Sequence, residues 1–333
     1  MDTYTTVMNK LDAAKRAKRC MRASEDAEYM LLRRLRAKGE IICPYPNMYM
    51  DRGYWNSLSP PDQMLHIMRT LSVGHPDMVF AGISAACAWG LDHSFYLHAQ
   101  DNRIMIAASS GTPTNEYCSQ VRRFYVPQHE IEQAQYVGGV KVTTIQRTLF
   151  DCGRIYEPRI ALSFYDSAIR QRLIAREDLV AYCNEKHRCR NQYQARALAT
   201  FANGLSENGG ESFCYGTMAE DGVMLPEQQV EFVDTNNPNT VYRVDYLWRL
   251  PDGTMIAGEF DGQRKYVDPS MTNGQNVGGI VKRERSRQNV LTTLGVSHTV
   301  RWFFEDAYHR LPMKKALAAA GVPIGEPTAP WIR

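Results

Sequence analysis

The chain contains 333 residues, of which 44% are hydrophobic and 23% charged, and its formal net charge is +3. This composition is ordinary for a folded protein and excludes wholesale disorder, while the length suggests two or three domains of about 100–200 residues each. No apolar run approaches the about 20 residues that span a bilayer. The opening residues lack the basic and apolar segments of a secretory signal. We therefore expect a cytoplasmic protein with no membrane attachment.

Eight cysteines are scattered along the chain without a C-x-x-C pair, so neither a disulfide framework nor a zinc ribbon is predicted. The tightest group is Cys183, His187 and Cys189, which lacks a fourth ligand at a sensible spacing. Reduced thiols beside a helix end are the favoured interpretation, and a metal site is the alternative.

The N-terminal region is basic. Ten lysines and arginines stand against four acidic residues between Lys10 and Lys38, a local net charge of +6. Such a block suits a polyanion such as double-stranded DNA, although a solvated helix face explains a charge run equally well. A helix is predicted over 24–38, because acids open it, leucines follow at helical spacing and basic residues precede Gly39. Two short extended pieces are predicted over 40–52, around a Pro/Asn turn.

A basic helix followed by a small hairpin is the order of a winged helix-turn-helix DNA-binding domain, which we place at 1–58. Its basic helix, together with a second basic helix near the C-terminus, supplies the candidate DNA contacts. They are Arg33, Arg34, Arg36, Lys38, Arg283 and Arg287.

The middle of the chain, 59–202, mixes strand-like and helical stretches, which predicts an α/β domain. Strands are expected over 104–108, 121–126 and 140–144, and helices over 62–71, 84–91, 145–156 and 158–172, with further helix to about 202. The small, polar, glycine-rich stretch 203–210 is predicted to be a linker to the next domain.

The region after this linker changes to the order α-β-β-β-α-β, followed by one more helix. Strands are expected over about 228–234, 241–250, 254–261 and 297–303, and helices over about 211–220, 277–294 and 305–320. This order defines an α/β domain over 211–322 with a tail at 323–333. The whole chain is therefore predicted to be a multi-domain α/β protein.

Three carboxylates fall on the predicted strands of the C-terminal domain. Asp245 lies in an apolar strand, where an unpaired charge is costly to bury. Glu259 and Asp261 are two residues apart on the next strand and so face the same side. A tight turn brings the three together, and a hard divalent cation, Mg²⁺ or Mn²⁺, is the natural counter-ion. The alternative is a structural ion network in which basic side chains neutralise Asp245 and Glu259.

Three further residues can serve the same site. Lys265 can supply positive charge near a phosphate, Glu211 opens the preceding helix, and Gln229 can orient water or backbone. This arrangement is the core of the restriction-type nuclease fold, in which metal-bound carboxylates support phosphodiester hydrolysis. The candidate catalytic residues are Asp245, Glu259, Asp261, Lys265, Glu211 and Gln229, of which the first three are the candidate metal ligands.

Several segments over about 205–306 resemble the Vsr-like branch of the PD-(D/E)XK nuclease superfamily. They are Glu211-Ser, Leu225-Pro-Glu-Gln-Gln-Val230, Arg243-Val-Asp-Tyr246, Gly258-Glu-Phe-Asp-Gly262, Lys265-Tyr266, Glu284-x2-Arg287 and Leu294-Gly-Val-x3-Val-Arg301. The resemblance implies a Mg²⁺-dependent DNA endonuclease. Two positions depart from it: Asp261 replaces the usual catalytic lysine, and Lys265 stands where many relatives carry a histidine. These departures leave open a variant active site or a fold that has lost cleavage.

Two upstream segments resemble the AbiEi-type antitoxin family over about 20–200. They are Ser84-Ala-Ala-x3-Gly-Leu91 and Thr144-Ile-Gln-Arg-Thr-Leu-Phe-Asp151. The resemblance implies a winged helix joined to an α/β domain, in a protein of a toxin–antitoxin, phage-defence operon. A DNA-binding antitoxin or transcriptional autorepressor with a degenerate nuclease domain is therefore the alternative to an endonuclease. A third hypothesis is an interaction protein whose middle domain binds a cognate toxin.

Overall fold

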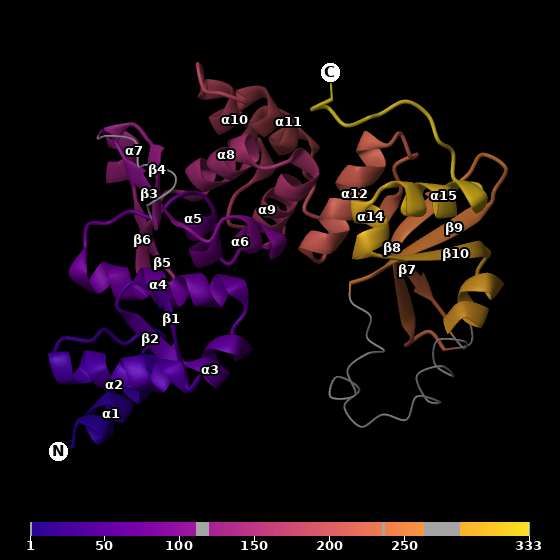
Figure 1. The fold of residues 1–333 in the computed structure, drawn as a ribbon. Coiled ribbons are helices and arrows are strands. Elements are labelled where there is room, and N and C mark those ends of the chain that lie inside the picture. The colour runs from indigo at the N-terminus through magenta and orange to yellow at the C-terminus, as the bar shows by residue number, and fades with distance from the viewer. Residues whose placement is uncertain (1, 111–119, 235–236, 263–286, 333) are drawn as a thin grey trace. The chain divides into compact units, whose positions relative to one another are not determined.

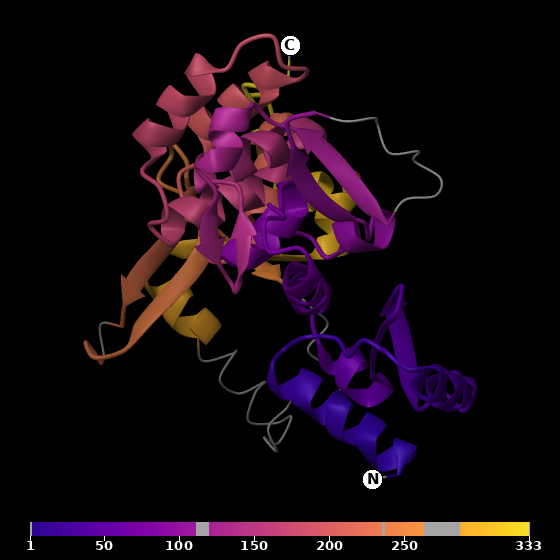
Figure 2. The ribbon, with the colours of Figure 1, turned by 90° about the vertical axis from the view of Figure 1, so that its left-hand side faces the viewer.

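A computed structural model describes residues 2–110, 120–234, 237–262 and 287–332 of the chain (Figures 1 and 2). The chain divides into two compact units, residues 1–91 with 95–152, and residues 92–94 with 153–333. Each unit combines helices with small β-sheets, so the predicted multi-domain α/β class is confirmed at this level. None of the helices in the described ranges combines the length and apolar composition of a membrane-spanning helix.

The first unit begins with two helices and a hairpin. These elements are α1 (Thr3–Arg16), α2 (Asp26–Ala37), β1 (Ile41–Tyr45) and β2 (Met48–Asp51), and a short helix α3 (Arg52–Ser57) follows. Leu32 and Leu35 of α2 pack with Val7 and Leu11 of α1 in one buried cluster. Acids in the first turn of α2 and arginines in its last turn complement the helix dipole. The predicted helix over 24–38 and hairpin over 40–52 are thus confirmed.

The remainder of the first unit surrounds its own small sheets. Phe80 links them, because it bridges both Ile106 and Val142. Strands β3 and β4 are parallel, whereas β5 and β6 form an antiparallel hairpin. The elements in chain order are α4 (Pro60–Gly74), α5 (Gly82–Trp89), α6 (Tyr96–Gln100), β3 (Ile104–Ala108), β4 (Val121–Tyr125), α7 (Gln128–Glu132), β5 (Gln135–Val137), β6 (Val140–Val142) and α8 (Ile145–Ile155). The three predicted strands are present, while α6, α7 and β5 were not predicted.

The boundary between the units falls inside α8, and the predicted linker 203–210 lies within the second unit. Helices α9 (Pro158–Arg170), α10 (Arg176–Glu185) and α11 (Gln192–Phe201) therefore belong with the C-terminal sheet rather than with the middle domain. The glycine-rich stretch is tied down, because the buried Asp166 carboxylate of α9 accepts hydrogen bonds from the backbone N–H groups of Asn203 and Gly204, each at 2.9 Å. The polar, glycine-rich stretch leads directly into α12, which begins at Gly209.

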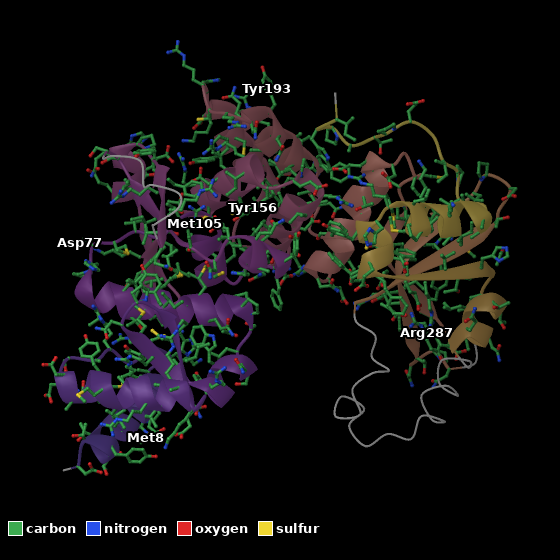
Figure 3. The ribbon with its side chains drawn as sticks, in the orientation of Figure 1. Met8, Asp77, Met105, Tyr156, Tyr193 and Arg287 are labelled. Atoms are coloured by element: carbon green, nitrogen blue, oxygen red, sulfur yellow. The ribbon has the colours of Figure 1, made fainter. Side chains whose placement is uncertain are left out.

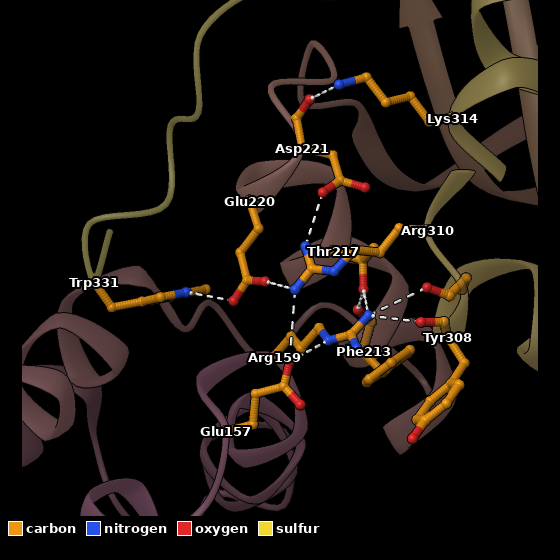
Figure 4. Close-up of polar contacts among 11 residues, drawn as sticks. Glu157, Arg159, Phe213, Thr217, Glu220, Asp221, Tyr308, Arg310, Lys314 and Trp331 are labelled. Atoms are coloured by element: carbon orange, nitrogen blue, oxygen red, sulfur yellow. Dashed lines mark hydrogen bonds and ion pairs between the residues drawn. The ribbon is translucent and has the colours of Figure 1, made fainter. Parts of the chain in front are cut away.

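Helix α12 (Gly209–Glu220) packs directly on α9. Gly216 makes this possible, since a Cβ atom there would lie 3.1 Å from the backbone of Arg159. The Arg159 guanidinium lies against the rings of Phe213 and Tyr308, 4.7 and 5.6 Å from their centroids, and donates to the backbone carbonyl of Tyr308 (Figure 4). A second arginine, Arg310, pairs with acids at the end of α12. These contacts join α9, α12 and the C-terminal helices into one layer.

The sheet of the second unit has the strand order β10-β9-β8-β7. Its strands are β7 (Glu227–Val233), β8 (Val241–Arg249), β9 (Met255–Asp261) and β10 (Val296–Phe303), with β10 parallel to β9 and the other pairs antiparallel. Helices α14 (Phe304–Tyr308) and α15 (Leu311–Ala319) follow, and the left-handed residue Arg310 (φ 62°) separates what was predicted as one helix. Residues 287–293 are helical, while most of the predicted helix 277–294 lies outside the described residues.

A tryptophan pair packs closely over β9. A Cβ atom at Gly258 would lie 2.7 Å from Trp302 and 2.8 Å from Trp248, both of which are fully buried. We expect Gly258→Ala to lower the free energy of unfolding by about 1–3 kcal/mol through overpacking. Chemical denaturation of the full chain measures this. The matched control is Gly262→Ala, four residues later, where the nearest atom of the described residues lies at 3.5 Å and stability should be unchanged. Equal stability of the two variants would contradict the packing described.

Candidate functional site

Strands β8 and β9 stop pairing at Asp245. Their last pair is Tyr246 with Gly258, and the same register places Asp245 opposite Glu259. At this point the Asp245 Oδ2 atom accepts a hydrogen bond from the backbone N–H of Phe260 at 2.8 Å. The side chain is half-buried, and this burial raises the pKa of the Asp245 carboxyl, an effect that the Phe260 N–H opposes. Asp245 thus lies where the two strands separate, and its Oδ2 atom is bonded to the main chain of β9.

Glu259 lies between two arginines. Its Oε2 atom is 2.8 Å from Nη2 of Arg301, and its Oε1 atom is 2.5 Å from Nη2 of Arg287. Figure 3 labels Arg287 among the side chains of the second unit. Arg301 is the β10 residue paired with Glu259, whereas Arg287 also donates to the backbone carbonyl of Arg243. Burial raises the pKa of the Glu259 carboxyl, and the two guanidinium groups lower it. Glu259 is thus paired as the ion-network alternative predicts.

Glu211 is held at the start of α12, where Asn208 caps the helix. The Glu211 carboxylate accepts hydrogen bonds from the backbone N–H of Glu207 at 2.7 Å, from Asn208 Nδ2 at 2.6 Å and from Gln229 Nε2 at 2.8 Å. Burial nevertheless raises the pKa of Glu211 to about 7, and the charge of Asp245 adds to the rise. Glu211 can therefore exchange a proton near neutral pH.

Gln229 has a left-handed backbone (φ 55°) within β7. Its neighbours pair with β8, Gln228 with Tyr246 and Val230 with Val244, whereas Gln229 itself is not paired. Its Nε2 atom donates to the carboxylate at the start of α12, and its Oε1 atom is buried without a hydrogen-bond donor among the described residues. Such a conformation costs about 1–3 kcal/mol in a non-glycine residue and persists where the surroundings enforce it. This strained residue is therefore held beside Glu211, with one amide oxygen left without a hydrogen bond.

The three predicted metal ligands do not form a closed cluster. In the described ranges, Asp245, Glu259 and Asp261 do not offer one oxygen each within 4.8 Å of one another. Asp261 is half-buried at the end of β9, and its charge adds to the rise in the pKa of Glu259. The ion pairs of Glu259 direct its carboxylate toward the arginines, which the strand pattern alone did not anticipate.

The residues present still fit a hard divalent cation by their donor chemistry. Oε1 of Gln229 and Oε1 of Glu259 are buried oxygens without hydrogen-bond geometry to any described donor, even though Arg287 lies beside the latter. Asp245 supplies a third oxygen donor from the adjacent strand. Carboxylate and amide oxygens are ligands that Mg²⁺ and Ca²⁺ sites use. A cation bound here would replace the guanidinium beside Glu259.

Sequence reasoning missed Arg301 and Asn208 as parts of this site. Arg301 is a charged residue at the end of a mostly apolar strand, which was the available signal for a buried ion pair. Asn208 precedes a glycine pair and a glutamate, a recognisable helix start. Lys265 and Arg283, the predicted phosphate contacts, lie outside the described residues.

The basic N-terminal helix exposes its predicted DNA contacts. Arg33, Arg34, Arg36 and Lys38 are all exposed, whereas Leu32 and Leu35 of α2 are buried. Within the described part of the chain, none of the four forms an ion pair. Their charges are therefore available to a polyanion, and a solvated helix face has the same appearance.

The predicted cysteine–histidine group of residues 183–189 is not arranged as a metal site in the described structure. Cys183, His187 and Cys189 do not bring their ligand atoms within 4.8 Å of one another in the described structure, and Cys183 is fully buried. Reduced thiols remain the favoured interpretation.

No family model matches the sequence, and no curated protein matches it. What the protein does is therefore inferred from its side chains and their surroundings.

Replacing Glu211 tests the electrostatics of the site. Because its pKa is raised in the folded state, Glu211 favours folding fully below about pH 4.5, and this contribution is lost as the pH rises through about 7. Glu211→Gln should match wild-type stability near pH 5 and exceed it at pH 8, by up to about 3 kcal/mol. Unfolding measured from pH 5 to 8 gives the difference. Glu326→Gln, an exposed control, should keep the wild-type profile.

A wild-type profile in Glu211→Gln would mean that Glu211 is not the group that titrates. In that case, the role of residues 208–211 would be to cap α12 through Asn208.

Proposed function

We propose that this protein binds DNA and that its second unit is a Mg²⁺-dependent endonuclease-like domain that hydrolyses DNA phosphodiester bonds. The observation that carries the proposal is Asp245, a half-buried acid at the point where β8 and β9 separate. Glu259 follows opposite it, and Glu211 with Gln229 approaches from the helix and the next strand. A single buried acid has a structural explanation, but four convergent oxygen-bearing groups, among them three acids with raised pKa values and a strained glutamine, favour a functional site.

The side chains divide the work of such a reaction. Asp245, Glu259 and Gln229 would hold Mg²⁺, which activates water and neutralises charge at the scissile phosphate when bound. Arg301 and Arg287, released from Glu259, would bind phosphate oxygens as fixed cations. Glu211, with a pKa of about 7, would accept a proton from the attacking water or a neighbouring group.

The first unit would supply affinity for DNA. A buried pair of leucines holds α2 against α1, while its exposed side carries arginines. The hairpin β1–β2 follows directly, which is the element order of a winged helix. Contacts from this region to phosphates would place DNA without selecting its sequence.

The second candidate function is a non-catalytic antitoxin or autorepressor that also binds DNA. The observation that favours it is the pairing of Glu259 with two arginines, which neutralises a carboxylate that a metal would otherwise need. Asp261 at the position of the usual catalytic lysine agrees with a lost activity. Under this function, the second unit would serve as a DNA-gripping or toxin-binding domain.

Asp245→Asn separates the two functions. The amide oxygen of asparagine can still accept the Phe260 N–H, so the fold is retained while one anionic metal ligand is lost. We expect wild type to nick plasmid DNA with Mg²⁺ or Mn²⁺ and the variant to be inactive. Mn²⁺ should also raise the free energy of unfolding of wild type, by about 2.7 kcal/mol at a hundredfold excess over its Kd, and should not stabilise the variant.

The matched control is Asp252→Asn, an exposed acid in the β8–β9 turn that also accepts a backbone N–H. It should cleave and bind metal like wild type. An ion network predicts the opposite of the expected result: no metal effect, and a loss of stability in Asp245→Asn. That outcome would replace the nuclease proposal with the DNA-binding antitoxin.

The DNA-binding proposal is tested by removing three charges from α2. In Arg33→Gln/Arg34→Gln/Arg36→Gln, affinity should fall for all DNA sequences. The slope of log K against log salt should become shallower by about 0.9 for each phosphate that the protein no longer neutralises. Fluorescence anisotropy with labelled duplexes over a salt series measures both.

A matched control removes three exposed arginines of the second unit, Arg172, Arg176 and Arg188, which changes the net charge equally. Its affinity should stay near that of wild type. If both triple variants lose the same affinity, the effect is one of net charge, and α2 is a solvated face.

A further inference from the structure

Three potential metal ligands from three helices of the first unit meet beneath its surface. The Sγ atom of Cys87 on α5 lies 3.8 Å from the Sδ atom of Met64 on α4 and 3.9 Å from the Nε2 atom of His98 on α6. Cys87 and Met64 are buried, each with 4% of its surface exposed, while His98 is half-buried. The cluster shares no residue with the acidic site of the second unit.

Local structure explains why these side chains converge. Helix α5 is buried along nearly its whole length and ends at Gly90, whose left-handed conformation (φ 68°) reverses the chain three residues after Cys87. The Leu91 N–H then bonds back to the carbonyl of Ala86, as in a Schellman cap. This turn leads the chain back to α6, so that His98 reaches Cys87.

The two separations from Sγ of Cys87, to Met64 and to His98, suit a bound ion. Metal–sulfur bonds of about 2.3 Å and metal–nitrogen bonds of about 2.0 Å put the donors of a three-coordinate site about 3.5–4 Å apart. A thiolate, a thioether and an imidazole form a soft donor set, which selects Cu(I) over hard cations. Met64 is the discriminating member, because a thioether is a poor ligand for Mg²⁺ or Ca²⁺.

Charge also favours a monovalent ion. One thiolate and one Cu(I) give a neutral complex, whereas a divalent ion with the same ligands would leave a net positive charge in an apolar setting, which is costly. We propose that Met64, Cys87 and His98 form a binding site for Cu(I) in the first unit. This site is independent of the proposed nuclease function.

Without an ion, these side chains form weak hydrogen bonds that binding must replace. Met64 Sδ accepts weak hydrogen bonds from the hydroxyl of Ser84 and from the thiol of Cys87. Cu(I) forms a bond to the Cys87 sulfur as the S–H bond breaks, and the proton passes to solvent. Copper and sulfur keep their oxidation states, so no other reactant is needed.

The test is competition for Cu(I) between the full-length, reduced protein and bathocuproine disulfonate. We expect one tight site per chain in wild type. Cys87→Ser should weaken it by about 100-fold, and Met64→Leu by about tenfold. X-ray absorption of the wild-type complex should show both sulfur and nitrogen ligands, with one sulfur fewer in Met64→Leu. Met64→Leu keeps core volume, and so the fold should be retained.

The matched control is Cys183→Ser, which removes a buried thiol from the second unit and should keep the tight site. Circular dichroism and the melting temperature without copper establish that each variant is folded. If Cys87→Ser and Met64→Leu retain wild-type affinity, or if Cys183→Ser loses it, the proposed site is wrong. Copper ligated by sulfur alone would likewise overturn it.

Discussion

The second unit depends on the burial of α12 between a helix and the sheet. Gly216 lets it approach α9, while its other side contacts Trp302, whose indole N–H lies 3.3 Å from the sulfur of Cys214. Tyr246 of β8 donates to the backbone carbonyl of Glu211 at 2.8 Å. A helix packed on two sides has little freedom to shift, because protein interiors are close-packed. Glu211 is therefore held at a fixed distance from the strands that carry the other acids.

The buried acids of this unit are stabilised in three different ways. Asp245 accepts a main-chain N–H, Glu259 binds two guanidinium groups, and Glu211 accepts three hydrogen bonds while its pKa rises to about 7. These differences have a chemical consequence, since neighbouring acids with separated pKa values can take different roles at one pH. The pairing of Glu259 is what distinguishes an ion network from a metal site, and it involves Arg287 and Arg301.

The order of helices and strands along the second unit could be predicted, because it follows from local pattern. Asp245 and Glu259 stand out as acids within apolar strands joined by a tight turn, and the structure places them opposite each other. The domain boundary at 203–210 could not be judged in the same way. Whether a glycine-rich stretch is a linker depends on partners such as Asp166, which lies 37 residues away from the Asn203 that it binds.

The sequence by itself determined most of the helices and strands, the basic character of α2 and the row of acids, since each depends on residues close together in the chain. Only the tertiary structure decided how charges and donors combine. Arg301 reaches Glu259 because β10 pairs in parallel with β9, although the two residues are far apart in the sequence. Met64, Cys87 and His98 likewise meet only because three helices pack together. Side-chain chemistry is encoded locally, but which groups share a site is set by packing across the fold.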